Sequence, residues 1–220
     1  MAWFEGAVPP GMNRFSAQPG VECYIETGVQ AVGQVQVGRF TYICGPSLIM
    51  AHSPVKIGDF CSVAANFHCV THEQHPTHFA TTFPLSDVLG VPTTHGGVIG
   101  LDANKNVTKA FPVTIGNDVW IGDSVSVFGG VTIGDGCVIG AKSLVTKDCA
   151  PYGVYMGTPA RLVRMRFPDE IIRQLQDLKW WTWTVEKLRA NAKFFETDFR
   201  DYQGQIADLI QEARPLLKTG

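Results

Sequence analysis

Five of the six histidines of this chain lie in or at the edge of one segment between residues 69 and 113. They are His68, His72, His75, His78 and His95. A neutral imidazole near pH 7 is a good general base and also a common metal ligand. The segment is too long for an idle connection and carries apolar residues such as Phe79 and Phe83. We therefore expect it to be a functional loop.

Three of these histidines, His72, His75 and His78, form an i, i+3, i+6 series. As ligands they would suggest zinc, but such a site is usually completed by cysteine or carboxylate groups. Only Glu73 lies close by in the sequence. We expect no metal, and a zinc enzyme stays open as an alternative.

A six-residue repeat flanks the histidine segment on both sides. Its aliphatic positions downstream are Ile115, Ile121, Val127, Ile133, Ile139 and Val145, each followed four places later by a small residue. Upstream they are Ile25, Ala31, Val37, Ile43 and Ile49, and after a two-residue slip Ile57, Val63 and Cys69. Neither the helical period nor strand alternation explains a period of six. It predicts a solenoid in which short strands alternate with turns.

These hexads, with Gly after the aliphatic residue as at Gly116 and Gly140, resemble those of the hexapeptide-repeat acyltransferases. The resemblance implies an all-β fold, a left-handed parallel β-helix with an inserted loop and a C-terminal helical segment. Its handedness comes from the resemblance, because parallel crossovers are generally right-handed. The expected divisions are an N-terminal segment 1–24, the β-helix 25–165 with its loop insertion 70–112, and C-terminal helices 166–220.

The loop is similar to that of one branch, the xenobiotic acetyltransferases that act on chloramphenicol or streptogramins. In that branch a histidine lies nine residues before the Pro of a Ser/Thr-aromatic-Pro element. Here the element is Thr82-Phe83-Pro84, and the count leads to His75. The resemblance implies that His75 is a general base that acts directly on the acceptor. Gln74 and His78 depart from the branch pattern, so we expect an unspecified small-molecule or saccharide hydroxyl, with an amino-sugar amine left open.

Residues 113–167 are similar to the most recognisable stretch of the wider family. The resemblance implies acetyl-CoA as the acyl donor. It places Trp120 at the thiol end, Ala141 at the pantetheine amides, Thr146 and Lys147 near the nucleotide, and Arg164 at a phosphate, where a cation is physically suited. Without the resemblance, Trp120 could be ordinary core or trimer packing, and both cations could be solvated surface charges.

The sequence changes character from Pro168, where a proline and two acids form a good helix opening. Apolar residues at helical spacing follow, and further helices are expected over 184–198 and 202–218. We expect these helices to cover the open end of the β-helix, since an uncovered coil end exposes a strand edge.

Composition narrows the possible partners and the location. The net charge is −2, which gives no reason to expect nucleic acid. The start resembles no signal peptide, and no apolar run is long enough for a membrane span. Six cysteines without a C-x-x-C pair are expected to be reduced, so we expect a cytoplasmic protein. The family resemblance implies a homotrimer with intersubunit active sites. A zinc hydratase of the β-helix carbonic anhydrase type and a non-catalytic binding solenoid stay open as alternatives.

Overall fold

The computed structural model describes residues 23–71, 79–83, 85–92 and 111–211. The strands are β1 Tyr24–Ile25, β2 Val29–Val37, β3 Tyr42–Ile43, β4 Ser47–Ile57, β5 Ser62–Val63, β6 His68–Val70, β7 Val113–Ile115, β8 Trp120–Ile121, β9 Ser126–Phe128, β10 Thr132–Ile133, β11 Val138–Ile139, β12 Leu144–Val145, β13 Gly153–Gly157 and β14 Ala160–Met165. The helices are α1 Leu85–Leu89, α2 Asp169–Leu178, α3 Val185–Ala190 and α4 Ala192–Glu196, with 3₁₀ turns η1 Trp180–Thr182 and η2 Ile206–Leu209.

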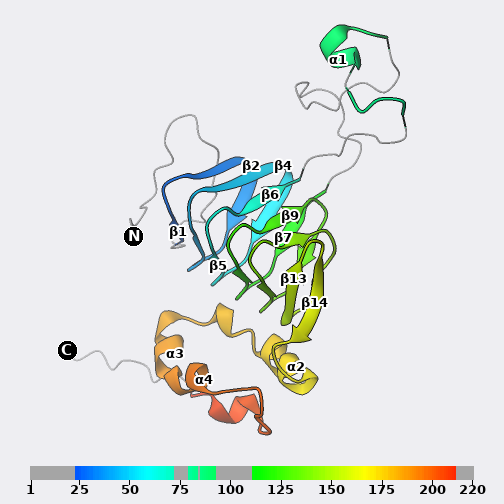
Figure 1. Ribbon diagram of the computed structural model, residues 1–220. Coiled ribbons are helices and arrows are strands. Elements are labelled where there is room, and N and C mark those ends of the chain that lie inside the picture. Colours follow the sequence, from blue (N-terminus) through cyan, green and yellow to red (C-terminus); the bar gives the residue numbers. More distant parts are fainter. Residues whose placement is uncertain (1–22, 72–78, 84, 93–110, 212–220) are drawn as a thin grey trace, which may run out of the picture.

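The strands before β14 form a solenoid with three faces (Figure 1). The first face stacks β1, β3, β5, β8, β11 and β13 in parallel. The long strand β4 contributes to both other faces, because it pairs with β6 through residues 48–50 and with β7 through residues 55–57. The second face thus holds β6, β9 and β12, and the third holds β7 and β10. This is the left-handed parallel β-helix that the resemblance implied.

The six-residue repeat places one aliphatic side chain of each strand inside the solenoid. On the first face Ile43, Val63, Ile121 and Ile139 lie in register from coil to coil, and each is 0% exposed. The small residues four places after the aliphatic positions from Ile115 to Val145 are also buried. They are Val119, Val125, Val131, Cys137, Ser143 and Cys149. The prediction of a stacked core with a period of six is therefore confirmed.

All six cysteines are free thiols. Cys61, Cys69, Cys137 and Cys149 are buried in the solenoid core. Burial raises the pKa of the Cys61 thiol to about 12, so this group is a neutral packing residue.

The corner between the third and first faces carries a column of residues with positive φ, and we call it the helix-side corner. Its members are Phe40, Phe60, Asp118, Gly136 and Tyr152. This conformation costs a non-glycine residue roughly 1–2 kcal/mol of conformational free energy. The preceding residues help to hold the turns, because the Asp59 backbone N–H donates to Asn117 Oδ1 (2.9 Å) and the Asn117 N–H to Asp135 Oδ1 (2.7 Å).

The corner between the second and third faces is where the inserted segment leaves and returns, and we call it the loop-side corner. Thr71 follows β6 and Phe111 precedes β7. Ser53 joins the two roots: its backbone N–H donates to Thr71 Oγ1 (2.7 Å), and its Oγ accepts from the Phe111 N–H (3.0 Å). Helix α1 lies within the insertion and stands away from the coils (Figure 1).

Two of the expected helices differ from the structure. The span 184–198 is divided into α3 and α4 at Asn191, whose Nδ2 donates to the Lys187 carbonyl (2.8 Å) and the Gln211 carbonyl (2.9 Å). A helix over 202–218 is wrong for residues 202–211, where only η2 forms. Gly204 weakens the helix here, and the Ile206 N–H donates to Gln174 Oε1 instead (2.7 Å). Residues 212–218 lie outside the described part.

The helical segment, from α2 to η2, lies along the helix-side corner and does not cover an end of the β-helix (Figure 1). At the last coil, β14 pairs antiparallel with β13 and covers that edge. Arg39, in an early coil, donates from Nη2 to the carbonyls of Trp181 and Trp183. The expectation of an end cap is wrong because aromatic side chains along the corner provide the apolar surface on which the helices pack.

None of the helices in the described ranges is long and apolar enough to cross a membrane.

Candidate active site

The proposed base, His75, lies outside the described residues, as do its neighbours 72–78 and Pro84. The structure therefore gives the place where its segment is attached but not the position of the imidazole. Phe79 and Phe83, which follow His75 closely in the sequence, are exposed, at 40% and 48%. The attachment point is the loop-side corner, at Thr71 and Phe111.

Trp120 projects outward from β8 on the first face and is 56% exposed. Its strand neighbours in register are Ser62 and Val138, while the next residue, Ile121, points into the core. An indole with this exposure is not part of the chain's own core, so that alternative for Trp120 is excluded. It offers a flat apolar surface to a bound molecule or to another subunit.

Ala141 lies one coil above Gly122, at the corner between the first and second faces. The two backbones are so close that a Cβ on Gly122 would lie 2.6 Å from the Ala141 nitrogen. Ala141 itself is exposed, so its small side chain leaves this corner open. Gly122 follows Trp120 by two residues, and the structure thus brings Trp120 and Ala141 into the same part of the surface.

Asp123 lies at the same corner, three residues after Trp120, where the family often has a serine. Ser124 Oγ donates to its carboxylate (2.7 Å), and so does Asn66 Nδ2 (3.0 Å). These two hydrogen bonds, Ser124 first, hold the pKa of Asp123 below its usual value. Ser124 is the next residue in the sequence, whereas Asn66 comes from the preceding coil and does not follow from the hexad pattern. The result is a fixed negative charge beside Trp120 and Ala141.

Arg164 lies in β14, in line with Trp120 across the first face. The register runs from Trp120 to Val138, then to Val154, then to Arg164. At a strand spacing of about 4.8 Å, the two residues are about 14 Å apart along the sheet. The Arg164 side chain is exposed, and its Nη1 donates to the adjacent Met165 carbonyl (3.1 Å).

Thr146 and Lys147 lie elsewhere, directly after β12 at the loop-side corner. Lys147 is exposed, and the neighbouring Asp148 accepts a hydrogen bond from the Thr132 N–H (2.7 Å). The second face separates these two residues from Ala141. The structure therefore divides the five expected donor-binding residues between two parts of the solenoid surface.

In a coil with three faces, the loop-side corner lies opposite the first face. Trp120 and the two roots of the His75 segment are consequently on opposite sides of one chain. No cluster of three or more potential metal ligands is present in the described ranges, which do not include the His72, His75 and His78 series.

Comparison with known proteins agrees with the repeat. The family described as bacterial transferase hexapeptide (six repeats) matches residues 112–147. A chloramphenicol acetyltransferase of Klebsiella aerogenes is 41% identical over 172 residues, which cover 71% of this chain and 79% of that protein. A chloramphenicol acetyltransferase of Agrobacterium fabrum is 41% identical over 136 residues, covering 61% of this chain and 62% of that protein.

A galactoside O-acetyltransferase of Escherichia coli K12 is 58% identical over 134 residues, covering 58% of this chain and 62% of that protein. Among solved structures, a mutant of AntD, an N-acyltransferase from Bacillus cereus, has a TM-score of 0.54 at 22% identity. It covers 73% of this chain and 82% of that one, was solved with dTDP-4-amino-4,6-dideoxyglucose and coenzyme A, and shows the shared fold.

The sequence left open a zinc hydratase and a non-catalytic solenoid, and the relatives overturn both interpretations. The chain belongs to the hexapeptide-repeat acetyltransferases.

Proposed function

We propose that the protein transfers an acetyl group from acetyl-CoA to a hydroxyl group of a small molecule or a saccharide. The observation that carries this proposal is the 39–41% identity to chloramphenicol acetyltransferases over most of the chain. The relative named for galactoside O-acetylation supports oxygen as the acceptor atom. No metal takes part in the proposed reaction.

In the proposed mechanism His75 is the general base. Its neutral imidazole takes the proton of the acceptor hydroxyl while that oxygen attacks the thioester carbon. The carbon–sulfur bond then breaks, and the CoA thiolate takes the proton back from the imidazolium. This direct transfer leaves the enzyme unchanged and needs no acyl-enzyme.

The surface around Trp120 is suited to the donor. An exposed indole can shield a thioester from water, and the open corner at Ala141 leaves peptide groups accessible to the amides of a pantetheine arm. Arg164, in line with Trp120, is an exposed guanidinium that could bind a phosphate. Thr146 and Lys147 would bind the nucleotide end from a second surface.

We propose that the functional unit is a homotrimer with one site at each subunit boundary. The support is geometric: Trp120 and the roots of the His75 segment lie on opposite sides of one chain. A site that uses both groups is more easily assembled from two neighbouring chains. The protein is proposed to act in the cytoplasm.

The role of His75 is tested by His75→Ala with CoA release as the readout. Loss of a general base is expected to lower kcat by about 10²–10⁴-fold, with little change in the KM for acetyl-CoA. His52→Ala is a matched control, because His52 is exposed on β4 and belongs to no proposed site. Turnover close to wild type in His75→Ala would contradict the role.

The subunit arrangement is tested with mixed trimers. His75→Ala and Trp120→Ala chains are each expected to be impaired, but trimers reassembled from equal amounts of both should recover activity. If each site takes His75 from one chain and Trp120 from its neighbour, about a quarter of the sites are intact. If both residues come from one chain, mixing restores nothing.

A further inference from the structure

The helix-side corner lacks large side chains in its middle, where the helical segment faces it. The ring centroids of Phe60 and Trp180 are 5.0 Å apart, and those of Tyr152 and Phe167 are 5.9 Å apart. Between these two aromatic contacts the column carries only Asp118 and Gly136. The Tyr152 ring lies against Gly136, so the short side chain of Asp118 leaves space between the coils and the helices.

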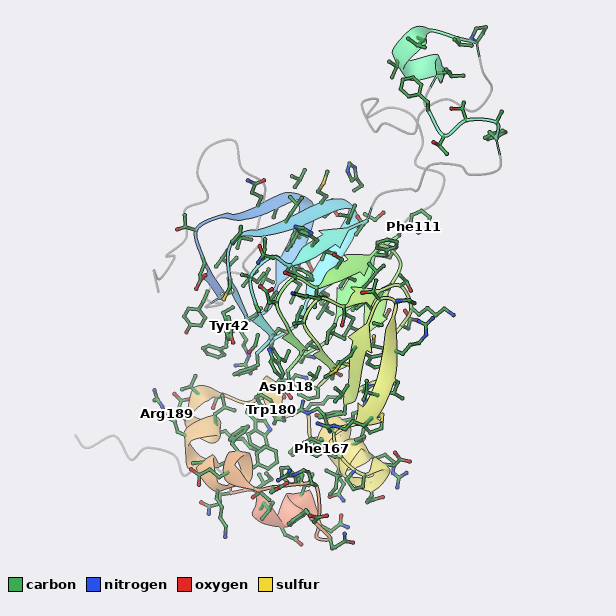
Figure 2. All side chains as sticks on the ribbon, viewed as in Figure 1. Tyr42, Phe111, Asp118, Phe167, Trp180 and Arg189 are labelled. Carbon is green, nitrogen blue, oxygen red and sulfur yellow. The ribbon has the colours of Figure 1, made fainter. Side chains whose placement is uncertain are left out.

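This space is a cavity of about 290 Å³. The solenoid contributes Asp118 and Tyr152 to its wall, and the helical segment contributes Trp180, Phe195 and Thr197. Figure 2 shows Asp118, Trp180 and Phe167 together at the junction between coils and helices. The volume is at the small end of ligand pockets, which span about 300–1,000 Å³, and is suited to a molecule of one or two rings.

The polar groups of the cavity form a neutral set. Arg166 Nη1 donates to Asp118 Oδ2 (3.1 Å) and to the Gly136 carbonyl (2.7 Å). The guanidinium also lies 5.4 Å from the centre of the Tyr152 ring and 5.1 Å from that of Phe167. An ionic ligand would therefore bring an uncompensated charge into a partly buried site, which is unfavourable.

Tyr152 provides a second and independent indication. The residue is 1% exposed, and its buried hydroxyl has no hydrogen-bond partner in the part of the chain that the structure describes. Buried polar groups are nearly always hydrogen-bonded, and one without a partner is unfavourable. Tyr152 lines the cavity, but its hydroxyl is not accessible in the free protein, so a ligand with a donor or an acceptor supplies the missing bond when the ring shifts toward it.

We infer that this cavity binds a small, uncharged, planar aromatic molecule that carries a hydrogen-bonding group. Aromatic rings in its wall favour edge-to-face or offset contacts with a second ring. The cavity is separate from the proposed donor surface, because Trp120 points outward from the first face whereas Asp118 lies on the helix-side corner. Binding here is independent of the proposed reaction, so it can be measured without turnover.

The test is saturation-transfer NMR on the full-length protein with three matched probes. The uncharged aromatic 4-hydroxybenzamide is expected to receive saturation. The non-aromatic cyclohexanecarboxamide and the anionic 4-hydroxybenzoate are expected to receive much less. No signal from 4-hydroxybenzamide, or equal signals from all three probes, overturns the inference.

Variants locate the signal. Thr197→Trp fills the wall of the cavity and is expected to abolish binding of 4-hydroxybenzamide. Lys193→Trp places the same side chain on an exposed position of α4 outside the cavity and should leave binding unchanged. Binding that persists in a folded Thr197→Trp protein overturns the inference.

Tyr152→Phe removes only the hydroxyl, so this variant tests binding in the cavity even if Thr197→Trp does not fold. Because the hydroxyl has no partner among the described residues of the free protein, the variant is expected to be at least as stable as wild type. Loss of one hydrogen bond to the ligand should raise the Kd of 4-hydroxybenzamide by about two- to tenfold. An unchanged Kd would place the ligand elsewhere and overturn the inference.

Discussion

The solenoid and the helical segment have cores of different composition. The buried core of the solenoid consists of aliphatic residues and cysteines, with Phe67 as its aromatic member. The core of the helical segment is half aromatic, with Tyr152, Trp183, Phe194 and Phe199 among its eight buried residues. Tyr152 belongs to the second core although it lies on a solenoid turn.

This difference shows two ways of fixing a structure. In the solenoid, the six-residue period gives each side chain its neighbours in the coils before and after it. In the helical segment, position depends on a few contacts to the helix-side corner. Arg39 donates to carbonyls of this segment from an early coil, and Arg166, just before α2, bonds to Asp118 and Gly136 in later coils. We therefore expect changes in the solenoid core to affect the whole molecule and changes at the corner to affect the helices first.

The largest effect is expected from Ile121→Ala. Ile121 is 0% exposed and lies between Val63 and Ile139 in the core of the central coils. Truncating a buried isoleucine lowers the free energy of unfolding by about 2–5 kcal/mol. In urea, far-UV circular dichroism and tryptophan fluorescence should both shift to lower midpoints, because the helices pack on the coils.

The adjacent residue provides the control for that change. Trp120 is exposed on the same strand, so Trp120→Ala should leave the midpoint of unfolding nearly unchanged. Equal destabilisation by the two substitutions would contradict the assignment of inward and outward positions on the first face.

A smaller and more local effect is expected from Arg39→Ala. Arg39 pairs with Asp59 (3.2 Å) and donates to the carbonyls of Trp181 and Trp183. Its loss leaves these partly buried acceptors without a charged donor, which lowers the free energy of unfolding by about 1–3 kcal/mol. Trp180, Trp181 and Trp183 all lie in the helical segment, so tryptophan fluorescence should change at lower urea concentration than far-UV circular dichroism.

Two further variants define what Arg39 contributes. Arg39→Lys keeps the charge but cannot reach several acceptors with one planar group, so it should recover only part of the loss. Arg200→Ala removes an exposed arginine that pairs with Asp198, and no measurable change is expected. Coincident transitions in Arg39→Ala would show that the two cores unfold as one.

The same difference explains which parts of the fold followed from the sequence. Hexads from Ile115 to Val145 predicted the coils because a strict period gives both the strands and their stacking. The position of the helical segment did not follow, since the bond from Arg39 to Trp181 joins residues 142 positions apart. The helix expected over 202–218 failed for a related reason, because a tertiary bond from Ile206 to Gln174 replaced helical bonds.

The roles of the site residues stay predictions, and the structure gives only their places in the fold. Residue types and family resemblance selected Trp120, Ala141 and Arg164, which the structure places on or beside the first face. The hexad count also indicates where the insertion interrupts a coil. Cys69, before the insertion, lies on the second face, and Val113, after it, lies on the third. The bond from Asn66 to Asp123 could not be found this way, because it joins two coils whose residues are 57 positions apart.

The smallest effect concerns Asp118, at the cavity between the two regions. Burial raises the pKa of this carboxyl above its ordinary value of 3.8, and the Arg166 guanidinium opposes that rise only in part. The folded protein therefore holds the Asp118 proton more tightly than the unfolded chain does. This contribution to stability is fully present below pH 3.8 and is lost as the pH rises through the pKa of the folded state.

Asp118→Asn removes that titration, and the variant should gain stability relative to wild type as the pH rises from about 4 to about 7. Urea unfolding of both proteins at each pH gives the difference in free energy, in which the titration of all other groups largely cancels. A difference that falls with pH would mean that the ion pair with Arg166 outweighs burial. The cavity wall would then be an ionic link between solenoid and helices. In that case tryptophan fluorescence of Asp118→Asn should change at a lower urea concentration than far-UV circular dichroism, as expected for Arg39→Ala.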